Sequence, residues 1–530
     1  MFFDNEVAIK SQAKSKTLRF PAPIRGLIRN ENIVLTKKAG AAVMENWFPT
    51  TTGLKTRRGV RKHATLTGSS AVMAMMTYQA TGQQKLFPAN DSGIFDATAP
   101  ATPSTVLSPA AGIGTSTNGD YSHVQFANAS GEFLLCVNGV NLHKVYNGTA
   151  WAENSPAITG TTTDNWSHIW SFKNRIFGVK KNTQTAIYLP VDSIGGAATE
   201  FTLGGVFKRG GQLLTGGTWS LDSGEGLDDL CFFASTEGEV AVYSGSDPSS
   251  SITWQLQGVY NIGRPMGKKA FFRAGGDVVI ATDDGLVPLS AAVNKDRAAL
   301  QSVAASYPIE ELWLQQTGSR NAVPWQCAVW PLQQKLIVST PTYGGATAQV
   351  LVANTRTGGW TVFNGLYDCR GLAPLGQNFY FGNSSGIVYQ AESGASDDGQ
   401  NYVCRAAGLF EDMGSPALQK IAKLMRGIFQ SSYQDFNPQF SVSTDFQTTW
   451  PAPPTSAAEP STSGLWGSST WGAFVWGGST SRYRKVDWYG VDGVGASVSW
   501  QCQVTLGNTA PPDIELAGID FVHEVGEAVA

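Results

Sequence analysis

The chain has 530 residues, enough for several ordinary domains or for one large repeat architecture. Glycine accounts for 59 residues, and only 15% of residues are charged, against about 25% in typical soluble domains, so turns and strands are favoured over solvated helices. The net charge of -3 argues against tight electrostatic binding of nucleic acid, and no apolar run is long enough for a membrane-spanning segment.

Residues 1–40 are polar, basic and interrupted by Phe20-Pro21-Ala22-Pro23, which predicts an extended N-terminal arm. The first 20 residues lack the apolar core of a signal peptide, so we expect synthesis in the cytoplasm. Single cysteines without a C-x-x-C pair are expected to be buried, reduced thiols. They are Cys136, Cys231, Cys327, Cys369, Cys404 and Cys502.

Residues 41–405 repeat a short apolar strand, a turn rich in Gly or Asn, and a second apolar strand, as in LDDLCFFASTEGEVAVYSGSDPS. The central turns recur at roughly 45 to 60 residues, close to the blade period of β-propellers. Stacking such meanders radially buries the faces that each would leave exposed alone. We therefore predict an all-β chain with an irregular β-propeller of about seven to eight blades, two of them without obvious outer strands. A pair of β-sandwiches is the alternative.

Two stretches depart from this pattern. Residues 294–318 have apolar positions near helical spacing, which predicts a small helical insertion between blades, at an interface or on the propeller rim. Residues 406–530 predict an additional C-terminal β-domain, which the N-terminal arm could complete. Within it, residues 451–484 are rich in Gly, Ser and Trp and predict a protruding loop.

Residue types that carry catalysis are dispersed. The histidines lie in different repeat units without metal-ligand spacing, and the Gly-rich stretches match no phosphate-binding loop, so we expect no catalytic residue, metal or cofactor. Asp283-Asp284-Gly285 reads as a turn between two strands, and adjacent carboxylates on a strand point to opposite faces. The five histidines are His63, His123, His143, His168 and His523.

Two segments resemble turns that are typical of propeller enzymes. Residues 443–450, STDFQTTW, come within one residue of the S-x-D-x-G-x-T-W turn of sialidases, but Gln447 replaces the glycine and only one copy exists. Residues 353–360, ANTRTGGW, echo the Thr-Gly…Trp turn of quinone-dependent dehydrogenases once, with shortened spacing. A secreted-type β-propeller that binds glycans or hydrolyses glycosides therefore stays the alternative to a non-enzymatic protein.

Three ordered segments resemble the tail nozzle, or tail tubular B-type, proteins of short-tailed bacteriophages. The first is AVMENWFPT with GLKTRRG over residues 42–59, and the second runs from STEGEVAVYSGSDP at 235 to GVYNIGRPMG, which ends at 267. The third is GGDVVI with TDDGLVP over residues 275–288. The motif positions are Asn46, Trp47, Pro49, Gly53, Arg57, Arg58, Gly59, Gly238, Tyr243, Gly245, Asp247, Pro248, Trp254, Gly263, Pro265, Gly267, Asp284, Gly285 and Pro288.

The resemblance implies a structural virion protein rather than an enzyme. In that family the nozzle is a homohexameric ring below a tail adaptor protein, next to tail fibres or spikes, and it encloses the DNA channel. Double-stranded DNA passes without sequence recognition, is retained after packaging and leaves when the nozzle opens during genome ejection. The motif residues are expected to mark positions in the fold rather than an active site.

Overall fold

The computed structural model describes residues 15–30, 39–101, 105–220, 229–341, 347–432, 436–454, 483–507, 511 and 513–528. It divides into two compact units. Unit 1 combines residues 1–57 with 399–530, and unit 2 comprises residues 58–398. Unit 2 is a β-propeller, which confirms the predicted fold class and rules out the pair of sandwiches there.

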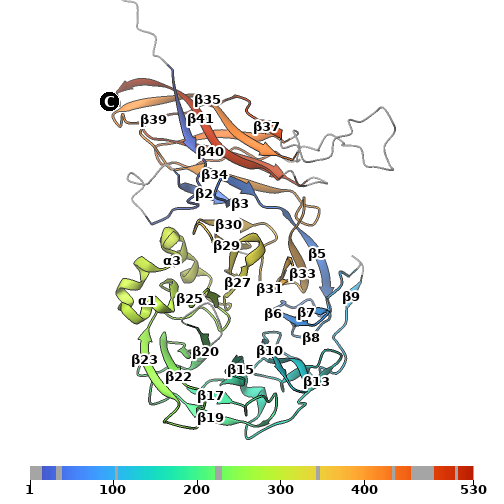
Figure 1. The fold of residues 1–530 in the computed structure, drawn as a ribbon. Coiled ribbons are helices and arrows are strands. Elements are labelled where there is room, and N and C mark those ends of the chain that lie inside the picture. The colour runs from blue at the N-terminus through green and yellow to red at the C-terminus, as the bar shows by residue number, and fades with distance from the viewer. Residues whose placement is uncertain are drawn as a thin grey trace, which may run out of the picture. The chain divides into compact units, whose positions relative to one another are not determined.

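The described residues of unit 2 form seven antiparallel blades, which Figure 1 shows as a ring. Each blade is a meander, and within the described residues two blades, β6–β8 and β24–β26, have three strands instead of four. In chain order the blades are β6 (Ala74–Ala80), β7 (Gln83–Asn90) and β8 (Gly93–Ile94); β10 (Ser122–Asn128), β11 (Gly131–Val137), β12 (Lys144–Tyr146) and β13 (Trp151–Glu153); β15 (Trp166–Phe172), β16 (Arg175–Lys180), β17 (Thr185–Tyr188) and β19 (Thr199–Thr202); β20 (Leu213–Trp219), β21 (Leu230–Ser235), β22 (Glu239–Ser244) and β23 (Gln255–Asn261); β24 (Phe271–Ala274), β25 (Asp277–Thr282) and β26 (Gly285–Pro288); β27 (Gln326–Trp330), β28 (Lys335–Ser339), β29 (Gln349–Asn354) and β30 (Trp360–Asn364); and β31 (Gly371–Leu375), β32 (Asn378–Gly382) and β33 (Ile387–Gly394) with β5 (Gly59–Leu66).

The ring is closed by joining the two ends of unit 2. Strand β5 lies at the beginning of unit 2 and β33 lies near its end. The two strands pair antiparallel, with Arg61 opposite Gln390. The first strands of successive blades also touch: β6 contacts β10, β10 contacts β15, β15 contacts β20, β24 contacts β27, and β31 contacts both β27 and β6. These inner strands bring residues far apart in sequence to the middle of the ring. Two short parallel ladders complete unit 2, β9 (Val106–Leu107) beside β5, and β14 (Ile158–Thr159) beside β18 (Gly196–Ala197).

Aromatic rings fill the spaces between blades. Trp254, which precedes β23, is 5% exposed and stacks on Tyr243 of its own blade and on Phe177 of the preceding blade. Phe172 and Phe201 of that preceding blade meet the same indole edge-on. Trp254 therefore anchors a blade interface, because its ring contacts two blades at once.

Helices occupy the predicted insertion, beginning at Leu289 rather than near 294. Trp313 of the longest helix is buried, meets the rings of Trp325 and Trp360, and donates its indole N–H to the carbonyl of Thr282 at 2.9 Å. Trp360 is the last residue of the segment that resembles the turn of quinone-dependent dehydrogenases, and its ring packs here against Trp313 of the helical insertion. The helices are α1 (Leu289–Asn294), α2 (Arg297–Leu300) and α3 (Glu310–Ser319), with 3-10 turns η1 (Thr163–Asn165), η2 (Gln301–Val303), η3 (Tyr307–Ile309) and η4 (Pro331–Gln333).

Unit 1 is β-structured as well. Strand β1 (Lys16–Pro21) pairs antiparallel with β41 (Glu515–Ala528), so the N-terminal arm does complete the C-terminal domain. One sheet contains β3 (Trp47–Pro49), β4 (Leu54–Thr56), β41, β35 (Leu418–Ser431), β37 (Tyr483–Lys485), β38 (Tyr489–Gly490), β39 (Val494–Gly495) and β1. In unit 1 a second run of paired strands is β2 (Ala41–Glu45), β34 (Tyr402–Gly408), β40 (Val498–Leu506) and β36 (Pro438–Thr444).

The division into units differs from the expected boundaries at 40/41 and 405/406. Residues 41–57 and 399–405 fall in unit 1, because β2 pairs with β34 and β34 with β40. Most of the predicted protruding loop, residues 455–482, lies outside the described residues. Among the described helices, none is long and apolar enough to cross a membrane.

Candidate functional site

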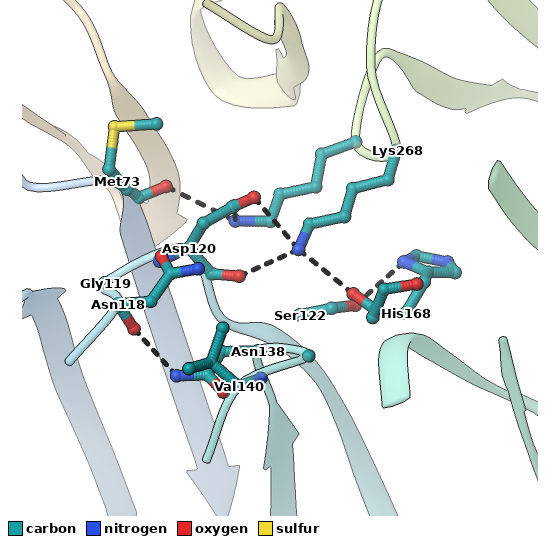
Figure 2. A network of polar contacts seen from close by, with 12 residues as sticks. Met73, Asn118, Gly119, Asp120, Ser122, Asn138, Val140, His168 and Lys268 are labelled. Carbon is teal, nitrogen blue, oxygen red and sulfur yellow. Dashed lines mark hydrogen bonds and ion pairs between the residues drawn. The ribbon is translucent and has the colours of Figure 1, made fainter. Parts of the chain in front are cut away.

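The middle of the ring holds a cluster of polar and charged side chains contributed by several blades, which we call the hub. Asp120 lies two residues before the inner strand β10, Lys268 and Lys269 lie shortly before β24, and His168 lies within β15. Ser122 is the first residue of β10. Figure 2 shows Lys268 directed at Asp120, with Ser122 and His168 beside them. The hub therefore collects its side chains at the inner edges of separate blades.

Asp120 lies between the two lysine ammonium groups. Its Oδ2 is 2.9 Å from Nζ of Lys268, and its Oδ1 is 2.9 Å from Nζ of Lys269. Lys268 also donates to the backbone carbonyls of Asp120 at 2.8 Å and Ser167 at 3.0 Å. Lys269 donates to the carbonyl of Met73, which also accepts from Gln326 at the start of β27. Asp120, the two lysines and Gln326 thus connect the blades of β6, β10, β15, β24 and β27.

The electrostatics of the hub follow from this geometry. Burial alone would raise the pKa of Asp120, but the ammonium groups of Lys269 and Lys268 outweigh that effect and hold its pKa well below the usual range. Burial lowers the pKa of Lys269, an effect that the charge of Asp120 opposes. The three side chains remain 11% to 22% exposed, so water screens the pairs only in part.

A second chain of hydrogen bonds passes through His168. The carbonyl of Gly216, in β20, can only accept, so Nε2 of His168 carries the proton and donates to it at 3.2 Å. Nδ1 then accepts from Ser122 Oγ at 2.8 Å, and Ser122 Oγ accepts from the backbone N–H of Ile169 at 3.3 Å. Burial, assisted by the charge of Lys268, lowers the pKa of His168 to about 3, which keeps the ring neutral. Neutral His168 thus ties three consecutive blades together.

Three further titratable groups of the propeller are held in their neutral forms. Burial, assisted by Lys269, lowers the pKa of His123 to about 4. Burial raises the pKa of the Cys136 and Cys231 thiols well above the usual value, which disfavours the nucleophilic thiolate. All six cysteines are free, and five are buried as predicted, with Cys327 half-buried. No group of three or more His, Cys, Asp or Glu side chains among the described residues could hold a metal ion.

The first motif segment lies mainly in unit 1, where Trp47 is fully buried in β3 and Pro49 ends that strand. Gly53 packs so closely on the backbone of Leu516 that a side chain there would displace it. Arg57 is 1% exposed despite its charge. Arg58 begins unit 2, and Gly59 begins β5.

The second segment surrounds β22. Gly238 has φ +81° and Gly245 has φ +120°, so both need the backbone freedom of glycine. Tyr243 lies in the aromatic cluster with Trp254 described above. Asp247 accepts from the backbone N–H of Ser249 at 3.1 Å and pairs with Arg175 at 3.4 Å, so it fixes the loop that Pro248 continues.

The third segment forms the turn between β25 and β26, as the Asp-Asp-Gly pattern predicted. Asp284 pairs with Arg297 of α2 at 2.5 Å, and Gly285 has φ +146°. Gly263 approaches the turn from the preceding loop, where Pro265 bridges to Thr282. The remaining positions are Gly267, which packs against the carbonyl of Trp325, and Pro288, the last residue of β26.

None of the motif residues is among the charged or hydrogen-bonding side chains of the hub, although Gly267 immediately precedes Lys268. The hub residues Asp120, Lys268 and Lys269 were not identified from the sequence. The available signal was the adjacent lysine pair directly before an inner strand, in a chain with few charges. The role of Asp120 could not be recognised from the sequence, because its partner Lys268 lies 148 residues away in the chain.

The sialidase-like turn has a structural role within unit 1. Asp445 has φ +48°, and its Oδ1 accepts from the backbone N–H groups of Ala496 at 2.9 Å and Ser497 at 3.1 Å. Its carboxylate therefore secures a turn after β36, outside the propeller.

Comparisons with protein-family models and with curated proteins each returned no match. Among solved structures, the WD40 β-propeller domain of Doa1 is 10% identical with a TM-score of 0.39, and the alignment covers 63% of this chain and 97% of that one. The β-propeller domain of Myceliophteria thermophila Cps50 (Swd1) is 11% identical with a TM-score of 0.39, covering 63% and 99%. Structural similarities at this level of identity and TM-score give no information about the activity or the partners of this chain.

Proposed function

We propose that this chain is a structural, non-enzymatic subunit of the tail nozzle of a short-tailed bacteriophage, located in the virion tail. The proposal starts from the three ordered sequence segments that resemble nozzle proteins. In such a ring the subunit would enclose the DNA channel, hold packaged DNA and open during genome ejection. Its partners would be further copies of itself, a tail adaptor protein and tail fibres or spikes.

The observation that best supports a structural role is that Asp120 is paired with both Lys268 and Lys269. A carboxylate intended for acid-base work needs a pKa near the working pH and a free face toward substrate. Asp120 is instead held ionised between Lys268 and Lys269, with both oxygens engaged by blades distant in sequence. The charged groups at the middle of this propeller therefore brace the ring.

The motif residues support the same reading, because they occupy turns and packing positions rather than one cavity. Gly238 and Gly285 permit tight turns, Trp254 joins two blades, and Asp284 secures α2. A rigid subunit suits a ring that resists internal pressure and moves as a body.

The test is co-assembly with the tail adaptor protein. We expect the purified chain alone to sediment as a monomer or weak oligomer, and the mixture to form rings of six copies visible by negative-stain electron microscopy. A stable monomer that cleaves glycosides or binds a glycan array with defined specificity would reject the proposal in favour of the secreted-type alternative.

A further inference from the structure

One sheet face of unit 1 carries a row of charged and aromatic side chains. Strand pairing places Asp520 of β41 opposite Arg19 of β1 on one side and opposite Arg426 of β35 on the other. Trp488, just before β38, continues the row, and its ring lies 4.5 Å from the guanidinium carbon of Arg426. We call Arg19, Asp520, Arg426 and Trp488 the arginine row.

The arginine row is pre-organised and carries an excess positive charge. Arg19 donates to both oxygens of Asp520 at 2.6 and 3.0 Å, and Arg426 donates to Oδ2 at 2.8 Å. The Asp520 side chain is 2% exposed, whereas that of Arg19 is 66% exposed. Two guanidinium groups share one carboxylate, so the row has a net charge of +1 and spare donors. Because both guanidinium groups are already fixed, less side-chain entropy is lost when a partner binds.

Exposed apolar side chains lie on strand β35, which carries Arg426, and on or next to the short strands that pair with it. Leu424, two residues before Arg426 on the same strand, is 40% exposed, and Trp488 is 42% exposed. Val486 and Val494 are 45% and 52% exposed. Exposed Arg and Trp on a sheet that also exposes apolar side chains have the composition of interface hot spots, which indicates a protein partner rather than a small anion. That partner must supply carboxylates and apolar side chains.

Such a surface exists on the helical insertion of unit 2. On α3, Glu311 is exposed and Leu314, three residues later on the same face, is 43% exposed. Tyr307, one turn earlier, is 39% exposed. The first turn of α3 carries Glu310 and Glu311 and its last turn carries no basic residue. Neither glutamate makes an ion pair within the described part of the chain. We call Tyr307, Glu310, Glu311 and Leu314 the acidic helix face.

We propose that the arginine row of one copy binds the acidic helix face of a second copy of this chain. Two observations support this assignment. The arginine row is positive and the acidic helix face is negative, and both surfaces expose apolar side chains. The contact joins two different surfaces, so it is heterologous, and repetition of a heterologous contact closes a ring when the rotation permits. This inference rests on the proposed function and deepens it by naming the surfaces through which nozzle subunits associate.

The test is a charge-reversal cycle in the full chain, read out as ring assembly with the adaptor protein. Arg19→Glu and Glu311→Arg are each expected to raise the protein concentration needed for half-maximal assembly at least tenfold, and the double variant to recover to within about threefold. Arg61→Glu and Asp164→Arg, which reverse exposed charges outside both surfaces, serve as matched controls and should assemble like the wild type. Thermal unfolding of each monomer identifies any variant that fails to fold.

Cysteine cross-linking provides a second readout that needs neither ring formation nor the adaptor. A Leu424→Cys protein mixed with a Leu314→Cys protein should give a disulfide-linked dimer under mild oxidation, at least fivefold above either protein alone. Rings that assemble normally in both single charge variants would overturn the inference while leaving the nozzle proposal intact. Loss in Arg19→Glu without loss in Glu311→Arg would also overturn it, by assigning the arginine row to a different protein. If the wild type forms no ring with the adaptor, the nozzle proposal fails, and the mixed cross-link still decides whether these surfaces meet.

Discussion

Arg57 donates a hydrogen bond from Nε to Oδ1 of Asn46 at 2.8 Å, within unit 1. The Asn46 amide donates in turn to the carbonyl of Val403 at 2.7 Å. The Arg57 guanidinium lies 4.0 Å from the ring centre of Tyr402, whose hydroxyl donates to the Arg57 carbonyl at 2.8 Å. Asn46 and Arg57, two residues of the first motif, thus hold this part of the chain against β34.

Replacing Asn46 with Ala should reduce the free energy of unfolding by about 2–4 kcal/mol, because Asn46 has φ +60° and its loss removes an acceptor of the buried Arg57. Asn182→Ala is the matched control. Asn182 is exposed with φ +61°, so its replacement tests left-handed strain alone and should cost about 1 kcal/mol. Urea unfolding followed by circular dichroism measures both; equal losses would show that the bond to Arg57 contributes nothing.

Replacing Asp120 with Asn should destabilise the propeller by about 2–3 kcal/mol, less than a fully buried pair because the hub retains some exposure. The loss arises because Lys268 and Lys269 are left without their carboxylate. Adding Lys269→Met should recover part of it by removing one unpaired charge. Asp164→Asn, at an exposed carboxylate, should change stability by less than about 0.5 kcal/mol. Chemical denaturation that finds no recovery in the double variant would refute the charge-balance explanation of the hub.

Acidification should destabilise unit 2 through His168. Its pKa is about 3 in the folded chain against about 6.5 when unfolded, so between these values the unfolded state binds the extra proton and stability falls as pH falls. By pH 5 this group alone accounts for about 2 kcal/mol.

A non-titrating side chain removes that contribution. His168→Gln should therefore lose about 2 kcal/mol less than the wild type between pH 7 and pH 5. His523→Gln in unit 1, where burial lowers the histidine pKa by a smaller amount, should show a smaller difference. Guanidinium titrations at both pH values provide the measurement, and parallel losses in wild type and His168→Gln would contradict the assignment.

Replacing Trp254 with Ala should reduce the free energy of unfolding by about 3–5 kcal/mol. The ring packs on Phe177 and Tyr243 across a blade interface, so its removal leaves a cavity there. Trp488→Ala removes the same side chain from an exposed position and should cost under about 1 kcal/mol. Differential scanning calorimetry compares the two variants. A similar decrease in melting temperature for both would indicate that the inter-blade cluster adds little.

The repeating turns of the sequence were enough to predict the propeller. Local chemistry explains this success, since Gly238, Gly285 and Asp284 define turns within a few residues. The closing pair of β5 and β33 could not be predicted, because it joins segments more than 300 residues apart. The boundary of unit 1 was missed for the same reason: β2 finds its partner only at β34.

The hub escaped prediction because its chemistry comes from position rather than pattern. His168, which the sequence shows only as one of five dispersed histidines, is a buried strand residue that connects blades. Lysines usually lie on solvated surfaces, so Lys268 and Lys269 stood out only once the ring placed Asp120 between them.

The central proposal, a structural subunit of a phage tail nozzle, is tested most directly by native mass spectrometry of tails isolated from virions, combined with images of the same sample. We predict six copies of this chain in a single ring below the adaptor. Virions that lack the chain, or a chain that occurs only as a free monomer with glycan-binding or glycosidase activity, would contradict the account.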